Sequence, residues 1–221
     1  MSKIASVAII DYGSGNLRSV EKAVERSIDD RGFCQSVVVT SCPDVVAQAD
    51  HIILPGVGAF GDCMGGLRAL DGMVDCLEQR VLRDGKAFLG ICVGMQLLAS
   101  EGHEHGVCRG LDWIKGVVEP LAIPEGEDLK IPHMGWNQIK ISAQHRSHPV
   151  LAGVMEGDHV YFVHGYHFRA GHADHVMMAT DYGFPLSAMV GRDNIIGTQF
   201  HPEKSQQVGL KLIGNFLGWR P

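Results

Sequence analysis

The sequence lacks the features that mark several large classes of protein. None of its six cysteines forms a C-x-x-C pair, which argues against a zinc knuckle or a dithiol redox site, so reduced thiols are expected. No stretch is long enough for a membrane helix, and the apolar run at 7–10 stops at Asp11, too early for a signal peptide. A formal charge of −6 with scattered Lys and Arg gives no basic stripe. We therefore expect a cytoplasmic protein that binds neither nucleic acid nor membrane.

The twelve histidines form no recognisable metal motif. The densest group, at 102–105, lacks the H-E-x-x-H spacing, and surface-loop histidine is the commoner explanation for such a group. We therefore expect no metal and no cofactor, and the lack of a basic stripe favours a small-molecule substrate.

The order of apolar and amphipathic stretches predicts an α/β fold. In the first half, strand-like runs at 4–10, 37–40, 51–54 and 87–91 alternate with helix-like stretches at 16–28, 67–82 and 93–99. This order predicts a parallel sheet with helices on both faces. From about residue 113, runs at 139–141, 159–163, 176–180, 187–190 and 195–200 predict additional, largely antiparallel strands, and 206–219 predicts a final helix. No linker separates the halves, so residues 1–221 are expected to form one domain.

The segment Gly90-Ile91-Cys92-Val93-Gly94 is the most informative in the chain. A cysteine between two glycines, after an apolar run and before a helical pattern, is typical of a nucleophile elbow. A thiol there lies over free backbone N–H groups and the positive end of a helix dipole, which favour the reactive thiolate. Packing alone would not demand the two glycines. Cys92 is therefore the candidate nucleophile.

A glycine-rich loop at 55–61 follows the preceding predicted strand. In open α/β sheets, ligands bind at the carboxyl ends of parallel strands, and glycines let backbone N–H groups approach a ligand. Beside a nucleophile elbow, this loop is a candidate for half of an oxyanion hole, through the N–H of Val57 or Gly58. The N–H of Val93 would supply the other half.

The segment His201-Pro202-Glu203 offers the base and the acceptor that a cysteine nucleophile needs. Proline pushes the preceding residue toward an extended conformation, in which residues i and i+2 point to the same side. Glu203 can then accept from one imidazole nitrogen of His201 while the other faces the thiol. The sequence thus predicts a catalytic triad of Cys92, His201 and Glu203.

With both motifs in this order, Gly-Ile-Cys-Val-Gly-Met-Gln and a distal Gln-Phe-His-Pro-Glu-Lys-Ser, the chain resembles the class I, triad-type glutamine amidotransferases. The resemblance implies a flavodoxin-like, mainly parallel central sheet flanked by helices, with additional antiparallel strands in the C-terminal half. It implies hydrolysis of glutamine to glutamate and ammonia through a cysteine thioester. It also implies that Gly58, Gln96 and Glu104 contact the glutamine.

Three further segments, at 11–16, 54–61 and 132–137, resemble one group of these glutaminase subunits. Members of this group deliver ammonia to a separate (β/α)₈ cyclase subunit in histidine biosynthesis. The resemblance implies a heterodimer with that cyclase. By the same analogy the residues that face the cyclase are Trp136, Asn137, Tyr161 and Lys204. A buried core role for Trp136 is an alternative.

Three other functions stay open at this point. One is the glutaminase subunit of another synthase, such as that of anthranilate or aminodeoxychorismate. Another is a free-standing cysteine hydrolase, which would need no partner, and the third is a non-catalytic docking subunit. The acidic segment at 121–130 is expected to be a loop, and the sequence assigns it no role.

Overall fold

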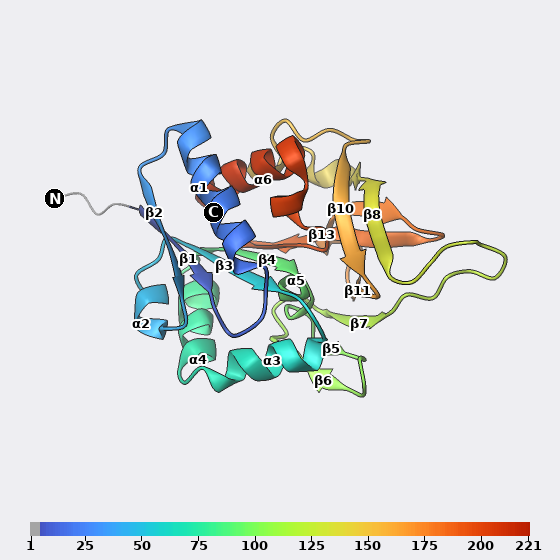
Figure 1. Ribbon diagram of the computed structural model, residues 1–221, viewed down its shortest axis with the longest axis horizontal. Helices are drawn as coiled ribbons and strands as arrows, with labels where there is room; N and C mark the ends of the chain where they lie inside the picture. The colour runs from blue at the N-terminus through green and yellow to red at the C-terminus, as the bar shows by residue number, and fades with distance from the viewer. Residues whose placement is uncertain (1–4) are drawn as a thin grey trace.

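The computed structural model describes residues 5–221, and a large β-sheet runs through its centre (Figure 1). Ile4, which falls within the first predicted strand, lies outside the described residues. Within them the sheet has eight strands, in the order β2 (Gln35–Thr40), β1 (Ala5–Ile10), β3 (His51–Gly56), β4 (Ala87–Cys92), β14 (Ile195–Thr198), β13 (Pro185–Arg192), β12 (Val176–Asp181) and β9 (Lys140–Ile141).

The first five strands of this order are parallel, and the last three are antiparallel to their neighbours. The prediction of a parallel sheet extended by antiparallel strands is therefore confirmed. One strand differs: the run at 195–200 was expected among the antiparallel set, but β14 lies parallel to β4 and antiparallel to β13. It closes the parallel part of the sheet directly beside the strand that ends at Cys92.

Helices cover both faces of the sheet. Helix α1 (Leu17–Arg31) packs against α6 (Gln206–Gly218) on one face, and α2 (Pro43–Val46), α3 (Phe60–Ala69) and α4 (Met73–Leu77) lie on the other (Figure 1). The apolar side of α1 follows the helical period and is buried, and the helix ends where Gly32 adopts a left-handed conformation. No helix in residues 5–221 combines the length and apolar character needed to cross a membrane.

Two helical stretches are shorter than the sequence predicts. The stretch at 67–82 is divided among the end of α3, all of α4 and most of the π-helix η1 (Glu78–Arg83). The break occurs because Leu70 is extended and Gly72 has a φ of 71°. After Cys92, α5 (Val93–Gln96) is one turn long and the chain then turns away. The remaining single turns are η2 (Ala143–His145), η3 (Pro149–Leu151), η4 (Ala173–His175) and η5 (Pro202–Lys204).

Two small sheets lie beside the large one. β10 (His159–His164) pairs antiparallel with β8 (His133–Gln138). The other sheet has the order β11 (Tyr166–Ala170), β7 (Gly116–Pro120), β5 (Glu101–Gly102) and β6 (Cys108–Arg109). The acidic segment at 121–130 contains no helix or strand and connects β7 toward β8.

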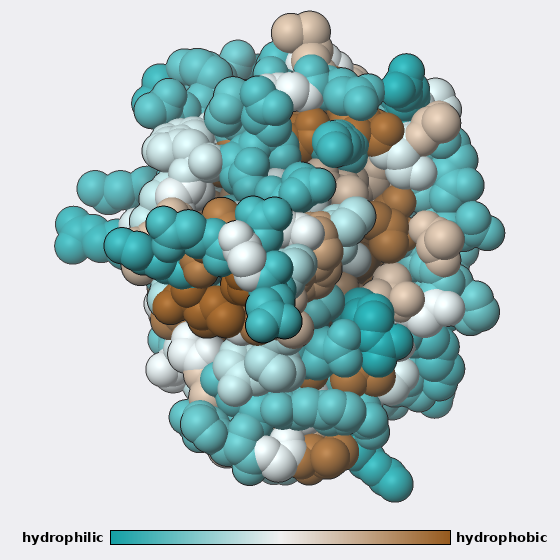
Figure 2. All heavy atoms as spheres, turned by 90° about the vertical axis from the view of Figure 1, so that its right-hand side faces the viewer, coloured by the Kyte–Doolittle hydropathy of each residue, from teal (hydrophilic) through white to brown (hydrophobic). Residues whose placement is uncertain are grey.

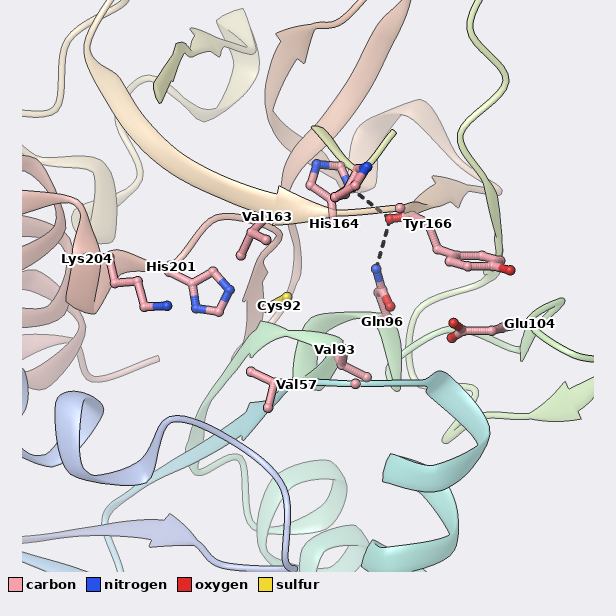
Figure 3. Close-up of a pocket in the computed structure, with 13 residues that line it drawn as sticks. Val57, Cys92, Val93, Gln96, Glu104, Val163, His164, Tyr166, His201 and Lys204 are labelled. Atoms are coloured by element: carbon pink, nitrogen blue, oxygen red, sulfur yellow. Dashed lines mark hydrogen bonds between the residues drawn. The ribbon is translucent and has the colours of Figure 1, made fainter. Parts of the chain in front are cut away.

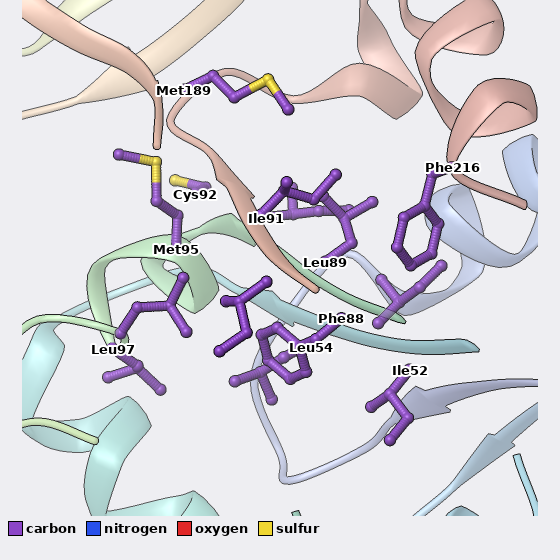
Figure 4. Close-up of a cluster of buried hydrophobic side chains, with 14 of the residues drawn as sticks. Ile52, Leu54, Phe88, Leu89, Ile91, Cys92, Met95, Leu97, Met189 and Phe216 are labelled. Atoms are coloured by element: carbon purple, nitrogen blue, oxygen red, sulfur yellow. The ribbon is translucent and has the colours of Figure 1, made fainter. Parts of the chain in front are cut away.

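Both halves of the sequence contribute to one hydrophobic core. Every residue of β3 and β4 is buried, as expected for central parallel strands covered on both faces. Figure 4 shows Ile52 and Phe88 from these strands in the same cluster as Met189 and Phe216 from the second half, with Cys92 at its edge. The nucleophile candidate is thus the last residue of a fully buried strand of this core.

Candidate active site

Cys92 lies at the junction between β4 and α5 in a strained backbone conformation. Its φ of 55° and ψ of −111° are unusual for a residue with a side chain. Such a conformation costs of the order of 1–3 kcal/mol and persists only where the surrounding structure enforces it. Here β3 and β14, the neighbours of β4, and the turn of α5 enforce it. The result is the sharp strand-to-helix turn of a nucleophile elbow.

The glycines around Cys92 allow backbone to pack directly on backbone. A Cβ on Gly94 would overlap the carbonyl group of Leu54 on β3, and a Cβ on Gly90 would lie 2.5 Å from the carbonyl oxygen of Gly94. Neither neighbour is a flexible side chain, so neither could move aside. These two glycines therefore serve the close approach of α5 to β3 and β4, which fixes the elbow.

His201 and Glu203 form a buried pair opposite Cys92. Nδ1 of His201 lies 2.9 Å from Oε1 of Glu203, and their side chains are 2% and 0% exposed. Backbone bonds hold the histidine in place: its N–H donates to the carbonyl of Tyr161, and its carbonyl accepts from Ser205 Oγ. Nε2 has no partner at normal hydrogen-bond distance within residues 5–221, and it points toward Cys92 (Figure 3).

The electrostatics of this pair favour a charged imidazole. Burial on its own lowers the pKa of His201, but Cys92 and Glu203 on either side outweigh it and raise the pKa to about 10. An imidazolium held beside a thiol stabilises the thiolate. The structure therefore brings the three predicted triad residues together in the order thiol, imidazole, carboxylate.

A cavity of about 350 Å³ opens over Cys92 at the carboxyl ends of β3 and β4. Most of the predicted site residues line it: Val57, Gly58, Cys92, Val93, Gln96, Glu104, His201 and Lys204. Sequence reasoning missed the opposite wall, which is formed by Pro132, Val163, His164, Gly165 and Tyr166. The signal for that wall was the pair of histidine-bearing segments at 132–137 and 159–166, whose pairing in β8 and β10 the sequence did not reveal.

Gln96 and Glu104 place hydrogen-bond acceptors at the end of the cavity away from His201 (Figure 3). The side-chain amide nitrogen of Gln96 donates to the carbonyl of Tyr166 and to Oε1 of Gln199, both at 3.0 Å, so its two hydrogens are used. Only its oxygen remains for a ligand. Oε2 of Glu104 accepts from the Phe60 N–H at 2.7 Å. This end of the cavity therefore suits an ammonium group.

The predicted oxyanion donors are not equally available. The N–H of Val57 lies 3.3 Å from Ser14 Oγ, to which it donates, and the carbonyl of Val57 accepts from Ser14 Oγ and Cys63 Sγ. In this arrangement the Val57 N–H is engaged by Ser14. Val93 is the first residue of α5, where a backbone N–H has no acceptor within the helix, and Gly58 lines the cavity with a φ of 102°.

Three of the four residues predicted to face a partner lie together on the surface. Trp136 is 46% exposed and meets the ring of Tyr161 edge-on, with centroids 6.0 Å apart, so a buried core role is excluded. Nζ of Lys204 lies 5.8 Å from the centre of the Tyr161 ring. Asn137 differs, because its side-chain amide is already used within the chain: it donates to the carbonyl of Asp181 and to Nε2 of the buried His133. Figure 2 shows the side of the molecule that lies on the right in Figure 1, where hydrophobic patches interrupt a mainly hydrophilic surface.

Within residues 5–221, no three His, Cys, Asp or Glu side chains are grouped as metal ligands would be. The six cysteines are all unpaired thiols, and Cys92 and Cys63 are buried.

Comparison with known proteins assigns the chain to a class. The family model for class-I glutamine amidotransferases matches residues 8–218. The chain belongs to this family.

Its relatives are more specific. The chain is 55% identical over 215 residues to the imidazole glycerol phosphate synthase subunit HisH of Rhodospirillum rubrum, covering 97% of this chain and 99% of the relative. It is 52% identical to the subunit of the same name from Rhodopseudomonas palustris, covering 98% of this chain and 100% of the relative.

Solved structures agree on the fold. A crystal structure of a glutamine amidotransferase matches with a TM-score of 0.69 at 20% identity, covering 96% of this chain and 97% of that one. The glutaminase domain of Trypanosoma brucei CTPS with bound acivicin matches with a TM-score of 0.64 at 14% identity, covering 98% and 95%.

Proposed function

We propose that this chain is the glutaminase subunit of imidazole glycerol phosphate synthase. It hydrolyses the side-chain amide of glutamine and delivers the ammonia to a cyclase subunit in histidine biosynthesis, a cytoplasmic pathway. The observation that carries the chemistry is the strained Cys92 elbow facing the buried His201–Glu203 pair in one small cavity. The relatives quoted above, matched over nearly their whole length, support the choice of synthase.

The geometry supports an acyl-transfer mechanism. His201 takes the proton of Cys92, and the thiolate attacks the carbonyl carbon of the glutamine side chain. The oxyanion is stabilised by the N–H of Val93 and by one from the Val57–Gly58 loop. His201 then protonates the departing ammonia, and water hydrolyses the thioester to release glutamate.

The α-amino end of glutamine accounts for the presence of Gln96 and Glu104 in the cavity. A glutamine whose side-chain carbonyl lies at Cys92 extends its α-amino group along the cavity. The free oxygen of Gln96 and the carboxylate of Glu104 offer this ammonium group the acceptors it needs. The proposed role of these residues is thus recognition of the free amino acid, which would exclude a glutamine residue within a peptide.

The proposed cyclase-binding surface consists of Trp136, Tyr161 and Lys204, beside the cavity mouth. Large aromatic residues are typical of interface centres, and Lys204 adds a cation over the ring of Tyr161. Lys204 also lines the cavity, so this surface is continuous with the reaction site. A partner docked there would receive ammonia directly from the cavity.

The experiment that tests the assignment is reconstitution. The chain is purified with the (β/α)₈ cyclase subunit of the same organism, and glutamine-dependent formation of imidazole glycerol phosphate is measured. We expect product from the pair and none from either subunit alone. Association with a chorismate-using enzyme instead, or glutamine hydrolysis that no partner influences, would overturn the assignment.

A further inference from the structure

Two buried histidines lie at the cavity wall formed by β10, His164 lining the cavity and His133 directly behind it. His133 on β8 and His164 on β10 lie directly across from each other, and Nδ1 of His133 is 2.9 Å from Nε2 of His164. The ring of His133 stacks on Phe162, with centroids 4.6 Å apart, and on Tyr182 at 4.0 Å. Neither histidine belongs to the proposed triad, yet His164 lines the cavity. Both rings are buried, and stacking holds the ring of His133 in place.

The hydrogen bonds of this pair have only one consistent direction. Nδ1 of His164 lies 2.9 Å from the carbonyl oxygen of Tyr166, which can only accept, so this nitrogen carries the proton. Nε2 of a neutral His164 is then an acceptor, and Nδ1 of His133 must donate to it. Nε2 of His133 in turn accepts from the side-chain amide of Asn137 at 3.2 Å.

This direction requires both imidazoles to be neutral, and their surroundings keep them so. Burial lowers the pKa of His133 to about 4 and that of His164 to about 3. A proton added to either ring would place two N–H groups face to face. The chain of bonds therefore runs from Asn137 through His133 and His164 to the Tyr166 carbonyl.

The inner end of this series of hydrogen bonds, the Tyr166 carbonyl, also contacts Gln96. Its amide nitrogen donates to the same Tyr166 carbonyl that accepts from His164, and Figure 3 shows the two bonds converging there. The second hydrogen of Gln96 goes to Gln199. The orientation of the Gln96 amide, and so the direction of its free oxygen, depends on where the Tyr166 carbonyl is held.

From this geometry we infer that His133 and His164 are positioning residues for glutamine binding. They hold the Tyr166 carbonyl, and through it they aim the side-chain oxygen of Gln96 at the amino-acid end of the substrate. This inference rests on the proposed glutaminase activity. The two histidines touch neither the reacting carbon nor the thiol, so they act on substrate affinity and leave the bond-breaking steps to the triad.

A pair of substitutions at His133 separates hydrogen bonding from packing. His133→Phe keeps an aromatic ring between Phe162 and Tyr182 but removes the donor to His164. His133→Asn loses the ring but places an amide N–H near the position of Nδ1. In the complex with the cyclase subunit, we expect His133→Phe to raise the KM for glutamine about 10-fold and to change kcat less than about threefold. His133→Asn should restore KM to within about threefold of wild type.

Alkylation of Cys92 by iodoacetamide provides a readout that needs no glutamine contact. Because the triad is untouched, we expect the full-length wild-type and His133→Phe chains to react at the same rate. An unchanged KM in His133→Phe would overturn the inference. So would a KM increase in His133→Asn as large as that in His133→Phe, because an N–H donor at this position would then fail to restore glutamine affinity. A fall in alkylation rate parallel to kcat would also overturn it, by showing general damage to the site.

Imidazole ¹⁵N spectra of the wild-type chain test the inference even if a variant does not fold. Both His133 and His164 should be neutral with the proton on Nδ1. A proton on Nε2 of His164 would overturn the inference. Failure of the proposed function is distinguishable, because in that case the wild-type complex itself would hydrolyse no glutamine.

Discussion

Nδ1 of His201 lies 2.9 Å from Oε1 of Glu203, and the two side chains are almost completely shielded from solvent. A carboxylate in this position fixes the tautomer and orientation of the imidazole, and it stabilises the imidazolium that forms during catalysis. Pro202 lies between the two residues in the sequence and begins the single turn η5. The pair thus explains how a three-residue motif supplies both the base and its orienting acceptor.

Glu203→Gln should weaken this support without changing the shape of the site. Loss of the carboxylate lowers the pKa of His201 from its value of about 10, so the thiolate–imidazolium pair becomes less favourable. We expect kcat/KM for glutamine to fall about 10- to 100-fold, because a hydrogen bond to a charged group contributes about 1.5–3 kcal/mol. The pH dependence of Cys92 alkylation should also change. An activity within twofold of wild type would contradict the proposed role of Glu203.

Acid should destabilise the fold through the buried histidines. The pKa values of His133 and His164 in the folded chain are about 4 and about 3, below the ordinary value of 6.5. Between those pKa values and 6.5 the unfolded state binds more protons than the folded state. The contribution of the two neutral histidines to stability is therefore fully present above pH 6.5, and it is lost as the pH falls toward 4 and 3. Denaturant titrations across this range measure the loss. His133→Phe should show a shallower dependence on pH, and an equal or steeper one would contradict this explanation.

The elbow should not tolerate a methyl group at Gly94. The added Cβ would overlap the carbonyl group of Leu54, which cannot move without shifting β3. We expect Gly94→Ala to lower the free energy of unfolding by about 1–3 kcal/mol or more, and to abolish Cys92 reactivity. Gly65→Ala is the matched control, because Gly65 lies in α3 with open space around it and should gain helix propensity. Equal stability of both variants would show that the packing at Gly94 does not determine the elbow.

Ser14 should restrain the free glutaminase subunit. Its hydroxyl group accepts from the N–H of Val57 and donates to the Val57 carbonyl, which keeps that N–H away from the oxyanion position. We propose that cyclase docking reorganises this loop. Ser14→Ala should then raise glutamate production by the isolated subunit about fivefold, the equivalent of one hydrogen bond of about 1 kcal/mol. Activity in the complex should change little. If the isolated variant were no faster than the isolated wild type, Ser14 would not be the restraint.

The sequence was sufficient to predict the elements whose cause is local. Continuous apolar runs predicted β3 and β4, because strands buried on both faces need no polar positions. Helix α1 was predicted from its period. In the structure the helix runs three residues beyond the predicted end, to a glycine C-cap. The elbow was predicted because the glycines flanking Cys92 reflect a backbone requirement that is visible in the sequence.

What the sequence did not reveal depends on contacts between distant segments. The strands β7, β8 and β11 carry mixed side chains, and their apolar patterns are too weak to distinguish from loops. The His133–His164 pair arises from the antiparallel register of β8 and β10, which no local pattern specifies. For the same reason the bond between Ser14 and Val57 could not be predicted, although the loop containing Val57 was.

The most direct test of the account is glutamate production from glutamine in the complex with the proposed cyclase subunit. Wild type, Cys92→Ala and Cys42→Ala are compared, because Cys42 is an exposed cysteine at the start of α2. We predict that Cys92→Ala abolishes glutamate production, that Cys42→Ala retains it, and that wild type without the cyclase is much slower. Glutamate production by Cys92→Ala at the wild-type rate would contradict the assignment of Cys92 as the nucleophile.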